Sequence, residues 1–491
     1  MKKAFGFLCV LGILIFLVGC RQNPVTPSKV PITTETAVST STQTTNETAV
    51  SVSTQIINGT SVSAAVEGTS KATVPASDKT TTGFAVFVSI QVTNTTALID
   101  GGIATVQGQS TAPSLKIDLD SVNIGTVKCF NGAFSYQVDI TALSGGWHYI
   151  RFYDQASAAE DGVWVNKLDG PSVLVSKKDV DVANTARTQN YKSRYKQWWD
   201  DNYSPTGIYF GSYGQRSGAS ARVKFDDDQI PLVLYNGDEW IYNPTTIAQR
   251  ALSYYRGDLK SGESDYDNFL KIARWLAGHQ EENGSFPYAF AFTYYDITIP
   301  TNWVSGMAQG QLLSVYARAY GLTKDPYYLI KGQQCLNFMI NDHHSAAGGC
   351  KVTIKDFTDL SPALKPYEND VLFDEYIFEP EPYVLNGNLF ALIGLYDWAS
   401  VATAAHGAAD AQNAFSQGCQ AIEVLLPYYD YHGYTAYDLL QYYPPAYGPN
   451  FTSTYAHDYH IVLLNSLAEI TGNSVFRKYC DLFVSYSNAA N

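Results

Sequence analysis

The sequence predicts a multidomain protein in which a β-sandwich precedes a mainly helical domain. The chain has 491 residues, more than one ordinary domain holds. Residues 83–178 alternate apolar and polar side chains, beginning with Phe84, Val86 and Val88, and a period of two is typical of half-buried strands. Residues 241–491 instead place apolar side chains at helical spacing, with repeated capping signals between them.

The N-terminus predicts a lipoprotein of a bacterial cell envelope. An apolar run, Ala4 to Val18, follows Lys2 and Lys3 and is shorter than the ~20 residues that a spanning helix needs. The tetrapeptide that ends at Cys20, LVGC, is typical of a lipobox. We expect residues 1–20 to be a signal peptide and Cys20 to carry the lipid that anchors the protein outside the cytoplasmic membrane. An uncleaved membrane anchor is the alternative.

Residues 21–80 are rich in Ser and Thr, and we expect a disordered tether there. Turn signals then separate short strands over residues 83–178, which favours an immunoglobulin-like β-sandwich. We interpret this sandwich as a structural spacer, with glycan binding as the alternative. Residues 180–240 are expected to be mixed β and irregular structure. The acidic run Asp226–Asp228 is interpreted as a solvated turn, with calcium binding as the alternative.

Capping residues mark the starts of the expected helices in the last domain. Asn243 before Pro244, Ser305, Asp325 before Pro326, and Asn473 each precede an apolar stripe. Paired helices with irregular excursions between them predict an α/α toroid or incomplete barrel.

Composition and missing motifs narrow the function. The formal net charge of −14 argues against a nucleic-acid partner, which requires a basic surface. The aromatic content of 14% suits the stacking of sugar rings. The sequence holds no P-loop, no His-Glu-x-x-His and no Cys-x-x-Cys, so we expect no metal site. A Cys335–Cys350 disulfide is an open alternative to free thiols.

A set of ordered motifs lies between Trp303 and Tyr486. They are Ser305–Gln311 (SGMAQGQ), Arg318–Tyr320 (RAY), Tyr383–Gly387 (YVLNG), Leu392–Asp397 (LIGLYD), Tyr437–Leu439 (YDL) with Pro449-Asn450, and Asp458–His460 (DYH). In order and spacing they resemble the C-terminal domain of D-glucuronyl C5-epimerases. Tyr242–Pro244 with Ile247–Gln249 is similar to a motif further upstream in that family.

This resemblance implies a uronyl C5-epimerase, an isomerase that converts glucuronate to iduronate within a polysaccharide. It implies catalytic roles for Glu375, Tyr376, Tyr437 and Tyr459, and substrate contacts for His460, Gln311, Asn386, Asp438 and Tyr242. Animal members carry arginine at two places where this chain has Leu440 and Ala456-His457. We therefore expect an unsulphated uronate polymer as the partner, and the family adds homodimerisation as an expectation.

The chemistry explains why these residue types are suitable. Epimerisation removes the proton at C5 and returns one to the opposite face, which requires an acid and a base on opposite sides of the ring. Donors must also neutralise the carboxylate and the enediolate, and no organic cofactor is needed. Tyrosine has an ordinary pKa of ~10, so a basic tyrosine needs a neighbouring donor or cation. His460, Gln311 and Arg318 are candidates, although we expect Arg318 to form a salt bridge instead.

Glu375 and Tyr376 impose a geometric condition. Adjacent residues on an extended strand point to opposite sides, so the chain must bend between them if both touch the substrate. Glu379 and Glu381, further along the same segment, are expected at a solvated rim.

Three other functions stay open from the sequence. A polysaccharide lyase begins with the same proton removal and then expels the C4 substituent. A non-catalytic glycan-binding surface protein is the second alternative, and an α/α-barrel glycosidase using Glu375 and Asp438 is a third.

Overall fold

The computed structural model describes residues 88–189, 193–211, 221–235, 237, 239–257, 263–443, 447–451 and 454–488. The expected signal peptide, Cys20 and the tether lie outside the described residues. Within these ranges, no helix combines the length and the apolar character needed to cross a membrane. The same ranges contain no group of three or more His, Cys, Asp or Glu side chains arranged to hold a metal ion.

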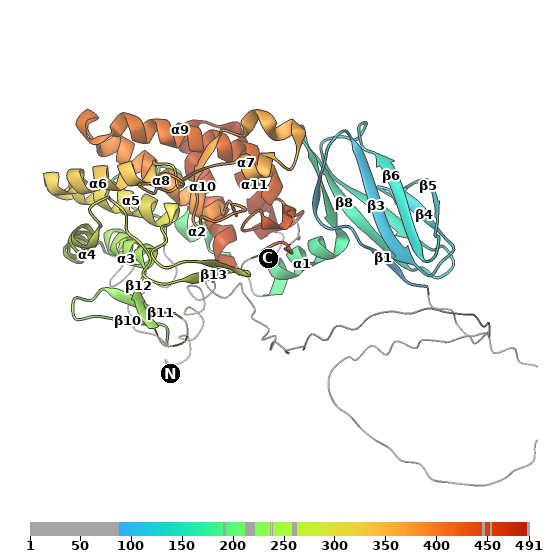
Figure 1. Cartoon of the computed structure of the whole chain (residues 1–491), viewed down its shortest axis with the longest axis horizontal. Helices are drawn as coiled ribbons and strands as arrows, with labels where there is room; N and C mark the ends of the chain where they lie inside the picture. The colour runs from blue at the N-terminus through green and yellow to red at the C-terminus, as the bar shows by residue number, and fades with distance from the viewer. Residues whose placement is uncertain are drawn as a thin grey trace, which may run out of the picture. The chain divides into compact units, whose positions relative to one another are not determined.

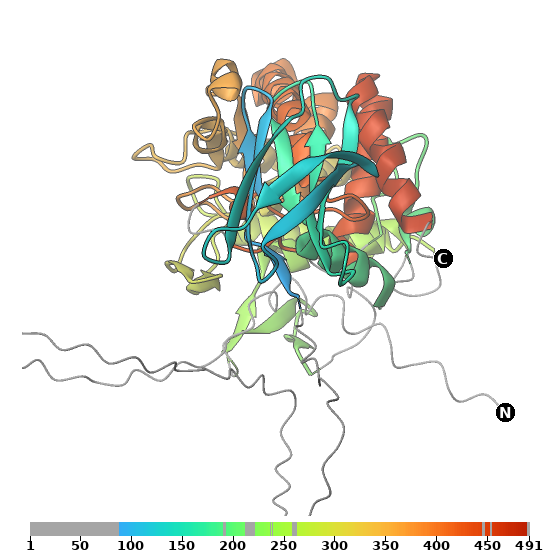
Figure 2. The ribbon, with the colours of Figure 1, turned by 90° about the vertical axis from the view of Figure 1, so that its right-hand side faces the viewer.

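Two antiparallel sheets make up the first part of the described chain (Figures 1 and 2). One sheet has the order β1-β3-β6, with strands Ile90–Val92, Ile103–Ser110 and Ala133–Asp139. The other has the order β2-β9-β8-β7-β4-β5, with strands Ala97–Ile99, Ser172–Ser176, Glu160–Lys167, Gly146–Tyr153, Ser114–Leu119 and Val122–Lys128.

Side chains from both sheets form one apolar core. Phe134 of β6 and Phe152 of β7 stack with ring centroids 5.0 Å apart, and Val106 of β3 and Ile117 of β4 are fully buried in the same cluster. Buried and exposed residues alternate along β3, because successive side chains of a strand point to opposite faces. A two-layered β structure is therefore present, while the narrower immunoglobulin-like assignment stays a prediction.

Helices dominate the rest of the chain, and short β-hairpins project between them. The helices are α1 Lys177–Gln189, α2 Tyr195–Trp198, α3 Pro244–Arg256, α4 Tyr266–His279, α5 Gly306–Thr323, α6 Pro326–Met339, α7 Lys355–Thr358, α8 Leu385–Val401, α9 Ala408–Leu425, α10 Thr454–Thr471 and α11 Ser474–Asn488. Short 3-10 turns are η2 Pro362–Tyr367, η3 Ala404–His406, η4 Leu426–Tyr429 and η5 Leu440–Tyr442. The strands pair as β10-β11-β12 (Val223–Phe225, Pro231–Tyr235, Glu239–Tyr242), β13-β14 (Phe292–Tyr294, Ile297–Ile299) and β15-β16 (Lys351–Thr353, Val371–Phe373).

The expected capping signals are confirmed at the starts of these helices. The Asn243 side chain accepts a hydrogen bond from the Thr246 backbone amide at 2.8 Å, with Pro244 in the first turn of α3. Ser305 caps α5 in the same way. A side-chain oxygen at the N-cap stabilises a helix by about 1 kcal/mol.

The helices pack in four consecutive pairs, α3 with α4, α5 with α6, α8 with α9, and α10 with α11. The first members also contact one another in series, α3 with α5, α5 with α8, and α8 with α10. Helix α8 is buried along most of its length, as expected for a helix that is apolar on all sides. Its backbone meets α5 closely, because a Cβ added to Gly394 lies only 2.0 Å from the backbone oxygen of Gly310.

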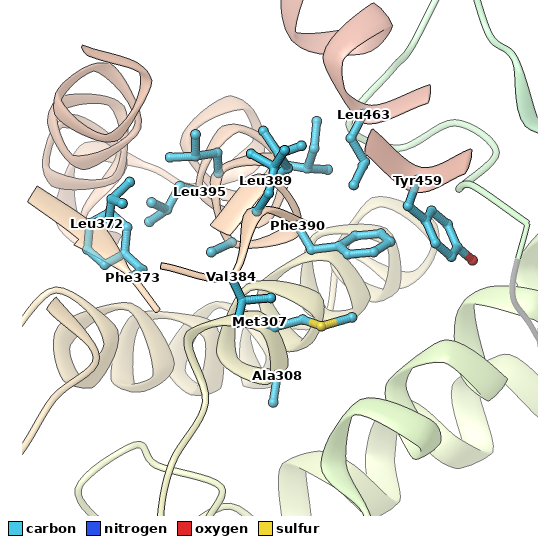
Figure 3. Close-up of a cluster of buried hydrophobic side chains, with 14 of the residues drawn as sticks. Met307, Ala308, Leu372, Phe373, Val384, Leu389, Phe390, Leu395, Tyr459 and Leu463 are labelled. Carbon is cyan, nitrogen blue, oxygen red and sulfur yellow. The ribbon is translucent and has the colours of Figure 1, made fainter. Parts of the chain in front are cut away.

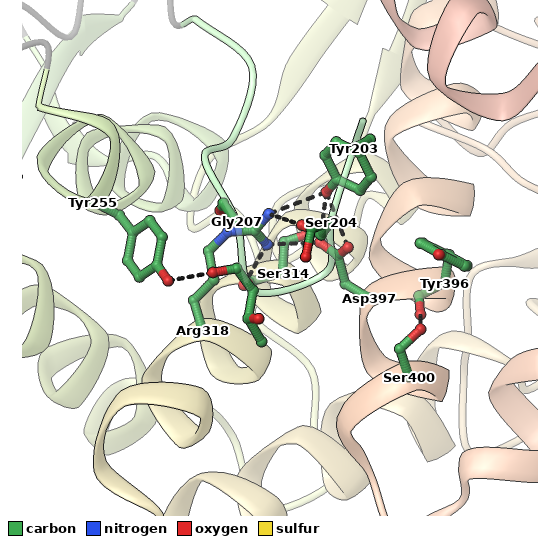
Figure 4. A network of polar contacts seen from close by, with 10 residues as sticks. Tyr203, Ser204, Gly207, Tyr255, Ser314, Arg318, Tyr396, Asp397 and Ser400 are labelled. Carbon is green, nitrogen blue, oxygen red and sulfur yellow. Dashed lines mark hydrogen bonds and ion pairs between the residues drawn. The ribbon is translucent and has the colours of Figure 1, made fainter. Parts of the chain in front are cut away.

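A buried ion pair joins α5 to α8 (Figure 4). Arg318 Nη1 donates to Asp397 Oδ2 at 2.7 Å, and both side chains are fully buried. The Tyr203 hydroxyl lies 2.9 Å from both oxygens of the same carboxylate. Arg318 therefore forms the salt bridge that the sequence favoured for it, and the catalytic tyrosines predicted from the sequence are not among its described partners. The Cys335 and Cys350 thiols are both free.

Candidate active site

Asp374 anchors the segment that carries Glu375 and Tyr376. The chain leaves β16 after Phe373 and bends at both residues, so the condition set by their adjacency is met. Asp374 Oδ1 accepts hydrogen bonds from the Glu375 amide at 2.8 Å and the Val384 amide at 3.0 Å. Its Oδ2 accepts from the Tyr383 amide at 2.7 Å. This carboxyl therefore fastens the bend to the first turn of α8.

Glu375 and Tyr437 form the centre of the candidate site. The Tyr437 hydroxyl donates to Glu375 Oε2 at 3.1 Å, and both residues are buried. Burial raises the pKa of Glu375 to about 8, while hydrogen bonds from Tyr437 and Tyr376 act in the opposite direction. Gly387 makes room for this carboxyl, since a Cβ added there lies 2.5 Å from Glu375 Cβ. A buried carboxyl that titrates near neutral pH can serve as acid or base.

Tyr376 lies beside Glu375 in an aromatic cage. Its ring centroid is 5.3 Å from that of Phe292, 4.9 Å from that of Tyr294 and 5.6 Å from that of Trp303. Burial, together with the charge of Glu375, raises the pKa of Tyr376 well above its ordinary value. The tyrosine is therefore held as a neutral phenol that donates a proton or a hydrogen bond.

Asp438 belongs to a second polar group on the same cage. The Tyr294 hydroxyl donates to Asp438 Oδ2, and Asn450 Nδ2 donates to the same oxygen at 3.0 Å. Burial raises the pKa of Asp438, although these hydrogen bonds oppose the effect. Tyr294 was missed by the sequence analysis, because an isolated tyrosine in a chain with 36 tyrosines carries little information.

Tyr459 has a different set of contacts (Figure 3). Its ring stacks on Trp198 with centroids 5.2 Å apart and an interplanar angle of 14°. It also meets Phe390 of α8 edge to face, with centroids 4.9 Å apart. Its hydroxyl donates to the carbonyl oxygen of Gly211. Tyr459 therefore contacts α8 at Phe390, one turn after Gly387. Gly387 is the residue of α8 that lies against Glu375.

His460 and His457 share one partner. The Nδ1 atom of each lies 2.9 Å from the Thr435 hydroxyl. Desolvation lowers the pKa of His457 to about 3, and desolvation with the nearby His457 lowers that of His460 well below its ordinary value. Both imidazoles are therefore neutral at pH 7. His460 Nε2 is buried and makes no hydrogen bond within the part of the chain that the structure describes.

Gln311 and Asn386 are the two predicted amide contacts. Gln311 lies on α5 and Asn386 in the first turn of α8, and both are fully buried. Among the described residues, the amide nitrogen and oxygen of each have no hydrogen-bond partner. Buried polar groups are nearly always satisfied in native proteins, so these amides are suited to hold hydroxyl or carboxylate groups of a ligand.

The structure corrects the prediction for Glu381, and it places Tyr242 apart from the Glu375 cluster. Glu381 is buried rather than solvated, beside Asp356 and Asp374, whose charges together with desolvation raise its pKa well above its ordinary value. Glu379 is exposed, as expected. Tyr242 is half-exposed on β12, where its hydroxyl donates to Asp226 at 2.7 Å and its ring packs on Trp275. None of these described partners of Tyr242 belongs to the Glu375 cluster.

The segment that contains this cluster is similar to known proteins. Residues 280–485 match the family model for the D-glucuronyl C5-epimerase C-terminus. A D-glucuronyl C5-epimerase of Caenorhabditis elegans is 30% identical over 230 residues, which are 45% of this chain and 35% of that protein. The family resemblance is confirmed. The matched segment begins before Trp303, where the ordered motifs start, and includes Tyr294, whereas the upstream motif at Tyr242–Gln249 lies outside it.

Other relatives are more distant. An uncharacterized protein of Methanocaldococcus jannaschii is 27% identical over 192 residues, covering 39% of this chain and 54% of that protein. The chain thus spans about a third of the Caenorhabditis elegans protein and about half of the Methanocaldococcus jannaschii protein. Two solved structures also match, at 11% identity each. A polysaccharide lyase has a TM-score of 0.29, with 82% of this chain and 48% of that chain covered. A family 76 glycoside hydrolase from a bovine Bacteroides thetaiotaomicron strain has a TM-score of 0.31, with 81% and 77% covered.

Proposed function

We propose that the protein is a uronyl C5-epimerase that converts glucuronate to iduronate residues within a polysaccharide. The carrying observation is the buried Glu375–Tyr437 hydrogen bond, with Tyr376 beside it, inside a segment that matches C5-epimerases. Glu375 is an acid–base group, and Tyr376 and Tyr437 are hydroxyl donors. Proton exchange beside a carboxylate needs both kinds of group.

Glu375 takes the role of base in this proposal. A general base works best when its pKa lies near the working pH, and burial brings that of Glu375 to about 8. Its carboxylate accepts the C5 proton, and the electron pair of the broken C–H bond moves into the enediolate of the sugar carboxyl group. Tyr437, which donates to Oε2, stabilises the ionised form before the transfer.

The remaining tyrosines act as donors. Tyr376 is held as a phenol, so it hydrogen-bonds the uronate carboxylate as charge develops there. Tyr459, on α10, returns a proton to C5 from the opposite face and recovers one from solvent, while Glu375 releases the proton that it took from C5 to solvent. Its hydroxyl exchanges its present bond to the Gly211 carbonyl for the substrate in this step. Gln311 and Asn386 supply amide contacts to the sugar, and His460 supplies a neutral imidazole.

An unsulphated polymer fits the described surroundings best. Leu440, Ala456 and His457 occupy the places where animal members have cationic motifs, and all three are buried. His457 is neutral because desolvation lowers its pKa. A sulphate group would therefore meet no positive charge from these three residues.

The wider organisation follows the same proposal. The four helix pairs form an incomplete α/α toroid, and the β part is an immunoglobulin-like spacer. A lipid on Cys20 holds the protein in the cell envelope, and the chain works as a homodimer.

Isotope exchange tests the reaction directly. The full-length protein is incubated with unsulphated glucuronate polymers in deuterated water, and the products are analysed by NMR and by chain length. Deuterium at C5 with intact chains supports the epimerase. Unsaturated ends indicate a lyase and new reducing ends a glycosidase, and either result refutes the proposal. A complete lack of exchange on every uronate polymer also refutes it.

A further inference from the structure

A groove of about 510 Å³ lies along α4, away from the residues of the Glu375 cluster. Lys271, Arg274, Trp275, Gly278 and His279 of α4 line one side of it. Residues three and four apart on a helix share a face, so these side chains form one continuous surface. A volume of this size is typical of small-ligand sites.

The groove has an aromatic wall. Trp275 and His279 stack with centroids 3.9 Å apart and an interplanar angle of 18°. Tyr242 packs on the same indole, with centroids 4.9 Å apart, and is itself partly exposed. Extended aromatic surfaces of this kind accept the apolar C–H faces of sugar rings.

The groove also carries exposed cations. The Lys271 and Arg274 side chains are 46% and 65% exposed. Their partners are Asp228 at 3.6 Å and Asp325 at 3.0 Å, and Asp267 also lines the groove. Exposed ion pairs contribute little, and the ammonium and guanidinium groups have three and five donors respectively. An incoming carboxylate can therefore share these donors.

The glycine at position 278 is a second, independent observation in favour of a ligand in the groove. Glycine inside a helix is less stable than alanine, so a helical glycine is expected to have a packing reason. At Gly278, no atom of the described residues outside the adjacent helix backbone lies within 4 Å of an added Cβ, and the residue is exposed. The described neighbours therefore do not require a glycine. The open space lies on the groove, where the absence of a side chain lets a flat ligand approach the helix backbone.

We propose that this groove binds carboxylate-bearing sugar units of an acidic polysaccharide, at a distance from the reacting unit. The sugar rings stack on the aromatic side chains, and Lys271 and Arg274 bind the carboxylates. At Gly278 the ligand lies against the helix backbone. The identity of the ligand rests on the proposed function, since the groove holds a remote part of the polymer whose uronate is processed at Glu375.

Filling the groove tests this proposal with little disturbance of the fold. Gly278→Gln places a long side chain over the exposed helix backbone, and Gly278→Ala adds only a methyl group there, so the pair gives a graded test. Lys271→Gln removes one cation. Its matched control is Lys478→Gln, which removes an exposed lysine of another helix, α11. Binding is measured by affinity electrophoresis of the full-length proteins in gels that contain unsulphated glucuronate polymer. C5 exchange is measured in parallel on a short oligosaccharide.

We expect Lys271→Gln to weaken polymer binding about fivefold, the upper size for an exposed ion pair, and Gly278→Gln to weaken it further. Gly278→Ala should bind more weakly than the wild type and more tightly than Gly278→Gln, Lys478→Gln should bind like the wild type, and exchange on the short oligosaccharide should be unchanged in all four variants. Wild-type binding in Gly278→Gln and Lys271→Gln would overturn the proposal for the groove while leaving the epimerase intact. A loss in Lys478→Gln as large as that in Lys271→Gln, or no retention of the wild type by the polymer, would overturn it as well. Groove-dependent retention by a protein without exchange activity would support the groove and refute the epimerase.

Discussion

Replacing Glu375 with glutamine should make the protein more stable at alkaline pH and abolish C5 exchange. Glutamine keeps the size of the side chain and an oxygen that can accept the hydrogen bond from Tyr437. The amide of glutamine cannot ionise, so the buried negative charge is never formed. The two effects arise from the same buried carboxyl, so one substitution examines both the electrostatics and the chemistry.

The magnitude follows from the pKa of Glu375, which burial raises from its ordinary 4.5 to about 8. Between these values the unfolded chain has released the proton and the folded chain has kept it. Folding stability from this group is therefore fully present below pH 4.5 and is lost as the pH rises through 8. Each pKa unit is worth 1.36 kcal/mol, so the full loss is about 5 kcal/mol, of which about 3 kcal/mol is lost by pH 7.

Chemical denaturation of the wild type and Glu375→Gln between pH 5 and pH 9 measures this difference. The free energies of unfolding should agree near pH 5, and the variant should be more stable by several kcal/mol at pH 9. Asp374, whose pKa burial raises to about 7, is present in both proteins, and its charge contributes to the raised pKa of Glu375 in the wild type. Parallel curves across the range would refute the reasoning, because they would mean that Glu375 ionises in the folded protein as it does in the unfolded chain.

The remaining predictions concern the tyrosines and the buried ion pair. Tyr437→Phe removes a donor that lowers the pKa of Glu375, so the pH–rate profile of C5 exchange should move to higher pH by about one unit; an unmoved profile would separate Tyr437 from the base. Tyr459→Phe should lower exchange about 10²-fold or more while circular dichroism shows an intact fold, and full activity would remove this residue from the mechanism. Arg318→Met leaves Asp397 buried without its cation, which should cost about 3–5 kcal/mol in thermal or chemical unfolding; exchange on the still-folded fraction should persist.

Local signals account for the parts of the fold that the sequence predicted well. The Asn243 cap with Pro244, and the two-residue alternation along strands such as β3, depend only on residues near in sequence. The family motifs also located Glu375, Tyr376 and Tyr437, which the structure brings into one cluster.

Long-range packing decided what the sequence could not predict. Glu381 is buried because the chain folds back over it near Asp356, and no local pattern records that return. Tyr294 joins the site through its bond to Asp438, 144 residues away. The bend at Glu375 depends on Asp374, whose partners at Tyr383 and Val384 are brought near by the start of α8.

The close approach of α5 and α8 limits how a wider substrate can be accommodated. Gly310 and Gly394 meet backbone to backbone. At this crossing, no side chain can be shortened to make space between the two helices that carry Gln311 and Asn386. Directed evolution toward a bulkier sugar should therefore leave this helix pair untouched. New space would have to come from the β13–β14 hairpin, where Phe292 and Tyr294 still offer atoms that can be removed.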